Sequence, residues 1–198
     1  MRTTAVTVTA LSLAAALSLA ACSSETKAET VKSDGSSPSA APAGPSAEPL
    51  AMGKGTETVG AGGGGKLDIT PVSVVYAAKT ATDKPSHGLY AVIAVQERPM
   101  TEVAAAETTP TEKGGWQWIA EDGQAVSSEP NIFLPGLDAG GPIRAGATQL
   151  RARTFDISSA QRGGTLTYTD GEGKTFRWQI PAQDSGPQVT KVKKALGS

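Results

Sequence analysis

The chain has 198 residues, a formal net charge of −1 and 38% hydrophobic residues, few of which are aromatic. This length allows one ordinary domain plus appendages. The near-neutral charge argues against nucleic acid as a partner, because binding to phosphates requires a basic surface. The chain contains one Cys, so an internal disulfide is excluded and that residue needs a separate explanation.

The N-terminus has the pattern of an export signal. A short positive segment, Met1–Arg2, precedes an uncharged apolar run from Ala5 to Ala20. This run is shorter than the roughly 20 residues that a transmembrane helix needs, and it matches the apolar part of a signal peptide. It ends in Leu19-Ala20-Ala21-Cys22, which resembles the lipobox of bacterial lipoproteins. We therefore expect a lipoprotein signal peptide at residues 1–21.

Cys22 is the predicted lipidation site. The lipobox resemblance implies a diacylglyceryl thioether on the Cys22 sulfur and a cleavage that makes Cys22 the first mature residue. Two acyl chains hold a protein stably on a membrane, whereas one does so only marginally. The sequence thus predicts a lipid-anchored protein on the extracytoplasmic face of the cell membrane. The alternative is that Cys22 is a buried apolar residue or a free thiol.

Residues 22–65 are predicted to form a disordered tether. The segment is rich in Ser, Ala, Pro and Gly and contains no aromatic residue, so it cannot bury enough apolar surface to offset its ordering entropy. Where this segment meets the expected domain, Gly60–Leu67 is close to the G-x-x-x-x-G-K-[ST] pattern of a phosphate-binding loop. However, Leu67 stands where Ser or Thr would bind magnesium, and a strand-like segment follows where a helix is required. We interpret these glycines as a flexible linker.

From Lys66 onward, short β-like segments alternate with turn signals. About seven strands at a spacing of about ten residues fit an all-β fold, an immunoglobulin-like antiparallel β-sandwich over residues 66–182. Gly88–Glu97 is apolar on both faces, which predicts a central strand covered on both sides. Pro71 indicates an edge or a bulge in the first strand. The expected segments are Leu67–Tyr76, Gly88–Glu97, Trp116–Ile119, Asn131–Leu134, Gln149–Ile157, Thr165–Thr169 and Thr175–Ile180.

Residues 183–198 are predicted to be a C-terminal tail. Val189, Val192 and Leu196 would align along one side of a short helix, with lysines on the other side. Such a basic face could contact anionic lipid. We favour a frayed, solvated tail over this alternative.

The order of these segments resembles the immunoglobulin-like domain of bacterial surface lipoproteins called DUF4352, which is MPT63-like in fold. The resemblance covers about residues 66–182 and implies a domain without known catalytic residues. It depends on Gly88, Tyr90, Val92 and Val95 of one strand, the Asp122-Gly123 turn, the Ala145-Gly146 turn, and the strand residues Phe155, Asp156 and Ile157.

Candidate catalytic and metal-binding residues are few. His87, the only His, lies in a turn before a strand, and no G-x-S-x-G motif accompanies it, so we expect it to be exposed rather than part of a Ser-His-Asp triad. Asp170 and Glu172, or Asp122, could hold calcium weakly, but their spacing does not match an EF-hand and a solvated turn is favoured. We expect no metal and no cofactor. A glycosidase pair of carboxylates that meets only in the fold stays open.

Two pairs of residues could form a binding face. Trp116 and Trp118 share one face of a strand, and we favour core packing over an exposed platform for sugar or protein. Arg151 and Arg153 also share a face and could meet an anion of the cell wall, but we favour their lying on the solvent side.

Together these patterns predict a membrane-anchored exported lipoprotein that displays a non-enzymatic immunoglobulin-like binding domain at the cell surface. Its expected partners are the membrane, through the lipid on Cys22, and an envelope protein or cell-wall polymer. The alternative is a small cell-envelope enzyme or ligand carrier, which would need a deep pocket with convergent polar groups.

Overall fold

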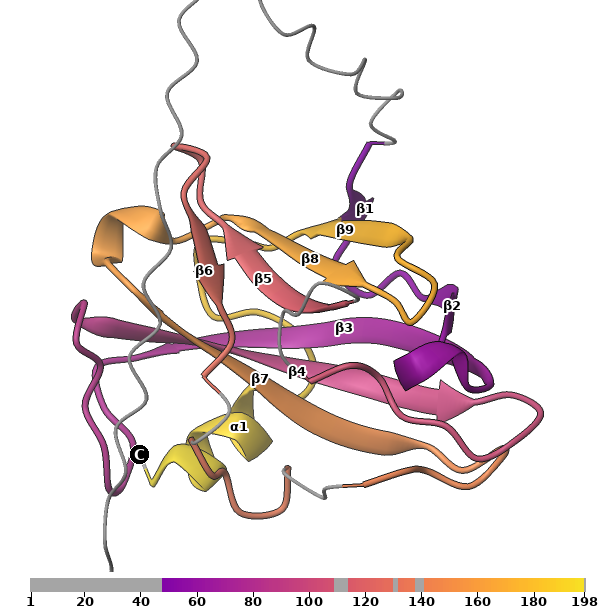
Figure 1. Cartoon of the computed structure of the whole chain (residues 1–198). Helices are drawn as coiled ribbons and strands as arrows, with labels where there is room; N and C mark the ends of the chain where they lie inside the picture. Colours follow the sequence, from indigo (N-terminus) through magenta and orange to yellow (C-terminus); the bar gives the residue numbers. More distant parts are fainter. Residues whose placement is uncertain (1–47, 109–113, 130–131, 138–140, 198) are drawn as a thin grey trace, which may run out of the picture. The chain divides into compact units, whose positions relative to one another are not determined.

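The computed structural model describes residues 48–108, 114–129, 132–137 and 141–197. These residues form a β-sandwich with one short α-helix (Figure 1). The strands are β1 (Leu50–Ala51), β2 (Thr56–Val59), β3 (Lys66–Ala77), β4 (Leu89–Pro99), β5 (Gly115–Ile119), β6 (Ala125–Ser127), β7 (Gln149–Ile157), β8 (Thr165–Thr169) and β9 (Thr175–Gln179), and the helices are the 3₁₀ turns η1 (Ala61–Gly63) and η2 (Ser159–Gln161) and α1 (Val189–Leu196).

The strands form two sheets that lie one above the other in Figure 1. The five-stranded sheet has the order β1-β9-β8-β5-β6, and the four-stranded sheet has the order β2-β3-β4-β7. All pairings are antiparallel except that of β1 with β9. In immunoglobulin nomenclature β3, β4 and β7 take the places of strands A, B and E, and β5, β6, β8 and β9 those of C, C′, F and G. The predicted fold class is therefore confirmed.

The core between the sheets is built by strict alternation along the strands, since successive side chains point to opposite faces. Leu89, Ala91, Ile93 and Val95 of β4 point inward from the four-stranded sheet. The five-stranded sheet contributes aromatic side chains, with Trp116 stacked near Trp178 at 6.3 Å between ring centroids. Burying each of these rings stabilises the fold by on the order of 4 kcal/mol. Between the sheets, Trp118 of β5 lies 6.4 Å from Tyr76 of β3 and 6.1 Å from Phe155 of β7, measured between ring centroids. Aromatic packing thus joins the two sheets in a chain that has no disulfide.

The first predicted strand and the central strand both match the structure. In β3 the register with β4 shifts between Pro71 and Ser73, which is the bulge that Pro71 indicated. The outer face of β4 is buried by a second apolar cluster that includes Val92, Leu134 and Val192. Residues 132–134, expected as part of a strand, instead belong to a loop of this cover.

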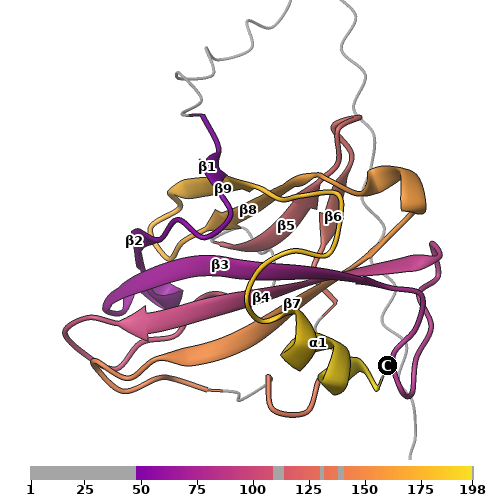
Figure 2. The same cartoon turned by 180° about the vertical axis from the view of Figure 1, so that it is seen from behind.

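The prediction of a frayed C-terminal tail is wrong. Residues Val189–Leu196 form α1, which lies below the four-stranded sheet in both views (Figures 1 and 2). Val192 and Leu196 are buried against the outer face of that sheet. A helix of eight residues is too short to be stable alone, so the apolar surface that it covers is what makes it form.

The prediction that the tether extends to residue 65 is also wrong for its last part. β1 pairs with β9 and β2 pairs with β3, so the described fold begins well before Lys66. Gly60, directly after β2, is packed rather than flexible. A Cβ on Gly60 would lie 2.1 Å from the Gly64 carbonyl oxygen, and one on Gly171 would lie 2.0 Å from the Gly60 carbonyl oxygen. Gly60 and Gly171 are therefore required for close approach of backbones, whereas Gly62 and Gly63 have open space around them and positive φ.

Candidate functional site

The predicted lipidation site, Cys22, and residues 22–47 of the predicted tether lie outside the described residues. Within the described ranges, no helix is both long and apolar enough to cross a membrane. The lipid anchor therefore stays a prediction from the sequence.

The three tryptophans are core residues, as the sequence analysis favoured for Trp116 and Trp118. Trp116, Trp118 and Trp178 are completely buried between the sheets. The Trp118 indole N–H donates to the Gln161 carbonyl at 3.1 Å, and the Trp178 indole N–H donates to the Lys54 carbonyl at 2.8 Å. An aromatic platform for sugar made of these rings is excluded by their burial.

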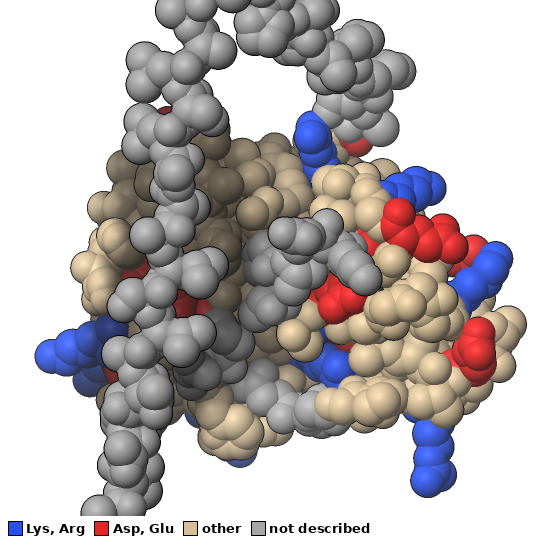
Figure 3. Space-filling model, viewed as in Figure 1, with Lys and Arg blue, Asp and Glu red and all other residues tan. Residues whose placement is uncertain are grey.

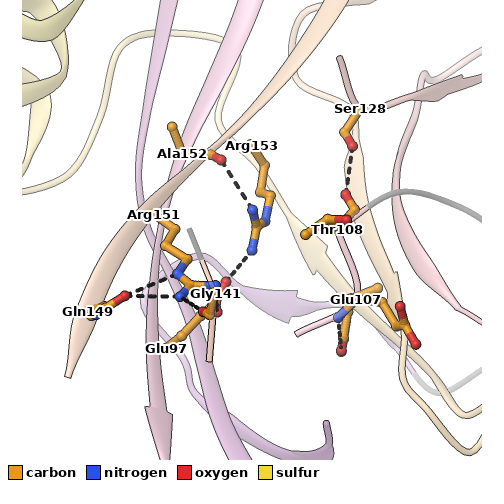
Figure 4. A network of polar contacts seen from close by, with 10 residues as sticks. Glu97, Glu107, Thr108, Ser128, Gly141, Gln149, Arg151, Ala152 and Arg153 are labelled. Atoms are coloured by element: carbon orange, nitrogen blue, oxygen red, sulfur yellow. Dashed lines mark hydrogen bonds and ion pairs between the residues drawn. The ribbon is translucent and has the colours of Figure 1, made fainter. Parts of the chain in front are cut away.

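Arg151 and Arg153 are buried as well, so their expected place on the solvent side is wrong. Both point into the sandwich from β7 and contact the fully buried Glu97 of β4 (Figure 4). One Glu97 oxygen accepts a hydrogen bond from Arg153, and the other lies 3.5 Å from Arg151 Nη1. Arg151 also donates to the Gln149 side chain at 3.0 Å and to the Gly141 carbonyl. We call Glu97, Arg151 and Arg153 the buried charge cluster.

The cluster lies against the aromatic core. The Arg153 guanidinium carbon is 5.3 Å from the centroid of the Trp116 ring, and Trp116 packs on Tyr168 at 4.5 Å. Burial lowers the pKa of Arg151 against the opposing effect of Glu97, and burial raises the pKa of the Tyr168 hydroxyl. Among the described residues Glu97 Oε2, Arg153 Nε and Trp116 Nε1 have no hydrogen-bond partner. The cluster therefore carries a high desolvation cost, and its paired charges are needed to offset it.

The alternation of inward and outward side chains along β4 and β7 could have predicted that these three charged residues face the core. Arg151 and Arg153 share parity with the inward-facing Phe155 and Ile157, and Glu97 shares parity with Val95. The prediction placed Arg151 and Arg153 on the solvent side because of their charge, although their parity in β7 directs them inward.

A second group of polar residues lies at the opposite end of β7. His87 is exposed, as expected, and its Nδ1 lies 3.4 Å from Asp156 Oδ1. Asp156 also accepts hydrogen bonds from the backbone N–H groups of Ser86 and His87. These residues border an open hollow of about 670 Å³. Among the described residues no hydroxyl is hydrogen-bonded to His87, so the pair lacks the activated nucleophile of a triad.

The turn carboxylates serve the fold. Asp170 is almost fully buried, which corrects its expected place in a solvated turn. It accepts hydrogen bonds from the backbone N–H groups of Val59, Glu172 and Lys174. Asp122 accepts one from Gln124 in its own turn. No cluster of three or more metal-ligating side chains occurs within the described ranges.

The outer face of the five-stranded sheet forms a third candidate. It lies opposite the buried rings and carries mainly hydroxyl and amide side chains, because alternation places them outward. A shallow hollow of about 350 Å³ occupies this face. We call it the threonine face, defined by Gln117, Ile119, Thr165, Thr167, Thr169, Thr175 and Arg177.

The threonine face differs from the other sheet surface and from the side of the domain in Figure 3. The outer face of the four-stranded sheet is apolar and covered by α1, whereas no described element covers the threonine face. On the side shown in Figure 3, acidic and basic side chains are interspersed. The residues that define the threonine face include one cation, Arg177, and no carboxylate.

Comparisons with known proteins add little to this geometry. No family model matches the chain, and no curated protein matches it, so the DUF4352 resemblance stays a prediction. Among solved structures, the putative lipoprotein YcdA of Bacillus subtilis is similar at a TM-score of 0.44 and 14% sequence identity. The similarity covers 71% of this chain and 41% of that one, so this chain matches well under half the length of its structural neighbour.

Proposed function

We propose that this protein is a lipid-anchored, extracytoplasmic binding domain without enzymatic activity. The anchoring part is supported by the Leu19-Ala20-Ala21-Cys22 box at the end of an apolar run. The binding part is supported by one structural contrast. The outer face of one sheet is sealed by α1, while the outer face of the other is polar, hollowed and uncovered by described elements.

The way in which side chains fill the interior favours binding over catalysis. The space between the sheets is occupied by Trp116, Trp118, Trp178 and the buried charge cluster. A substrate would therefore have to react on the surface. The most suggestive surface pair, His87 and Asp156, borders a hollow that Ser127 and Ser158 also line. Among the described residues no hydroxyl is hydrogen-bonded to His87, which leaves recognition as the function that this geometry supports best.

Anchoring is tested by the Cys22→Ala variant of the full chain, with Cys22 intact as the control. We expect the variant to leave the membrane fraction after a high-salt wash, because it lacks the acyl chains that would insert into the bilayer. Mass spectrometry of the mature N-terminus should show the diacylglyceryl group on wild-type Cys22. A variant that stays in the washed membrane fraction would contradict anchoring through this residue.

Binding is tested by crosslinking in intact cells through a photoreactive residue at position 117, on the threonine face. A matched probe at position 190 on α1, where Thr190 is exposed, reports proximity unrelated to that face. We expect a partner or polymer adduct specific to position 117. Equal yields at both positions, or none above a tag-only control, would count against a binding role for the threonine face.

A further inference from the structure

We propose that the threonine face binds the glycan strands of the cell-wall polymer. This inference depends on the proposed extracytoplasmic location, since it is there that a hydroxyl-rich polymer surrounds the domain. It identifies the ligand of the threonine face, which the proposed function leaves unspecified.

The face presents unused hydrogen-bonding groups. Among the described residues, the Gln117 amide and the Thr165 hydroxyl have no hydrogen-bond partner, and both are only partly exposed. Thr169 and Thr175 share one hydrogen bond of 3.0 Å between their hydroxyls, which leaves acceptor lone pairs on both. A sugar hydroxyl is both donor and acceptor, so it complements amide and hydroxyl groups of this kind.

The groups are also held in fixed rows. Gln117, Thr167 and Arg177 lie side by side across β5, β8 and β9, and so do Ile119, Thr165 and Gln179. Thr167 is buried with its hydroxyl donating to the Gln117 carbonyl at 3.3 Å, and the Gln179 amide donates to the Gly163 carbonyl at 2.8 Å, so Gln117 and Thr165 are the members of these rows that offer unused groups. Neighbouring strands are about 4.8 Å apart, a spacing close to the size of one pyranose ring. Threonine is stiff about χ1 because it is β-branched, so little side-chain entropy is lost when a ligand binds. Such a face suits a polymer with regularly repeated hydroxyls.

The charge of the face narrows the class of ligand. Among its defining residues Arg177 is the one charged side chain. A positively charged polymer would find no carboxylate to pair with on this face. A polymer with many negative charges would need more than one cation on the face. A glycan that is neutral or bears scattered carboxylates fits best. Because the face has no aromatic ring, we expect weak binding per site, and many repeats on one polymer strand would raise the effective concentration.

Pro49, which precedes β1, also lines the hollow. The described part of the chain therefore begins beside the threonine face. Residues 23–48 could span at most about 90 Å when extended, which keeps the domain within the layer of envelope just outside the membrane. The polymer of that layer is consequently the hydroxyl-rich partner within reach.

The test is co-sedimentation of residues 23–198, which include every described residue, with insoluble peptidoglycan stripped of protein and anionic polymers. The variant is Thr165→Val/Thr169→Val/Thr175→Val, which removes three hydroxyls and keeps the β-branched shape. The matched control is Thr56→Val/Thr190→Val, on the other sheet and on α1. We expect wild type and control to pellet equally and the triple variant to bind at least tenfold more weakly, with unchanged circular dichroism.

Several results would overturn the proposal. These are wild type staying in the supernatant, equal pelleting of the triple variant, or stronger binding to phosphatidylglycerol vesicles than to peptidoglycan. Sedimentation velocity adds another, since self-association lost in the triple variant would identify a second copy of this chain as the occupant. None of these results touches the Cys22→Ala test, so the proposed anchoring would stand or fall separately.

Discussion

At the scale of single residues, the buried charge cluster is the most constrained feature of the domain. One carboxylate, Glu97, faces two guanidinium groups in a site from which water is almost excluded. Each buried charge costs several kcal/mol to desolvate, and only mutual pairing offsets that cost. The three residues therefore act as a unit, and losing one leaves the others uncompensated.

We expect Glu97→Gln to lower the free energy of unfolding by about 3–5 kcal/mol, because it leaves Arg151 and Arg153 buried without a counter-charge. Urea unfolding followed by Trp fluorescence measures this change. The control is Glu57→Gln, which breaks an exposed ion pair of 2.7 Å with Lys66 and should cause no measurable loss. Similar midpoints for the two variants would show that the cluster is not a stability element.

At the scale of elements, the glycine-rich segment after β2 shows how composition can mislead. A run of glycines is typical of a flexible linker, yet here Gly60 accepts and donates backbone hydrogen bonds within a packed loop. Its N–H donates to the Gly65 carbonyl at 2.8 Å, and its own carbonyl accepts from the Gly63 N–H at 3.0 Å. The absence of side chains lets this loop lie against the β8–β9 turn.

Two alanine substitutions separate packing from flexibility. Gly60 and Gly64 both have negative φ, −66° and −89°, so neither needs glycine for its backbone conformation. A Cβ on Gly60 would collide with the Gly64 carbonyl oxygen at 2.1 Å, whereas one on Gly64 would have its nearest neighbour at 3.5 Å. We expect Gly60→Ala to lower the melting temperature by several degrees, equivalent to about 1–3 kcal/mol, and Gly64→Ala to leave it unchanged or slightly raised. Equal melting temperatures would indicate a flexible loop.

At the scale of the whole molecule, the two ends of the described chain complete the sandwich. β1 adds to the edge of the five-stranded sheet beside β9, and the Trp178 indole N–H donates to the Lys54 carbonyl next to it. At the other end α1 seals the outer face of the four-stranded sheet through Val192 and Leu196. A domain cut to residues 66–182 would lack all of these contacts.

We therefore expect residues 48–198 to unfold cooperatively at the same temperature as residues 23–198. Residues 66–182 should be less stable by several kcal/mol or fail to fold, since removing a large buried side chain such as Leu196 alone costs about 2–5 kcal/mol. Differential scanning calorimetry of the three fragments decides this. Equal stability of the shortest fragment would show that β1, β2 and α1 are accessories.

Local patterns were enough to predict β3, β4, β5, β7, β8 and β9 and the inward rings. Alternation is a property of neighbouring residues, so it can be read without knowing the partner strand. The same pattern assigned Trp116 and Trp118 to the core and predicted that β4 is covered on both faces. The Leu19-Ala20-Ala21-Cys22 box, equally local, predicts where the protein resides.

Only the tertiary structure decided the remaining features. β1 has two residues and finds its partner, β9, more than a hundred positions later in the chain, as with Leu50 and Trp178. The helix α1 is too short to form without the apolar surface beneath it. The burial of Arg151 and Arg153 depends on Glu97 from another strand, and the threonine face exists only once β5, β8 and β9 are aligned. These features arise from contacts between segments far apart in sequence, which local periodicity does not encode.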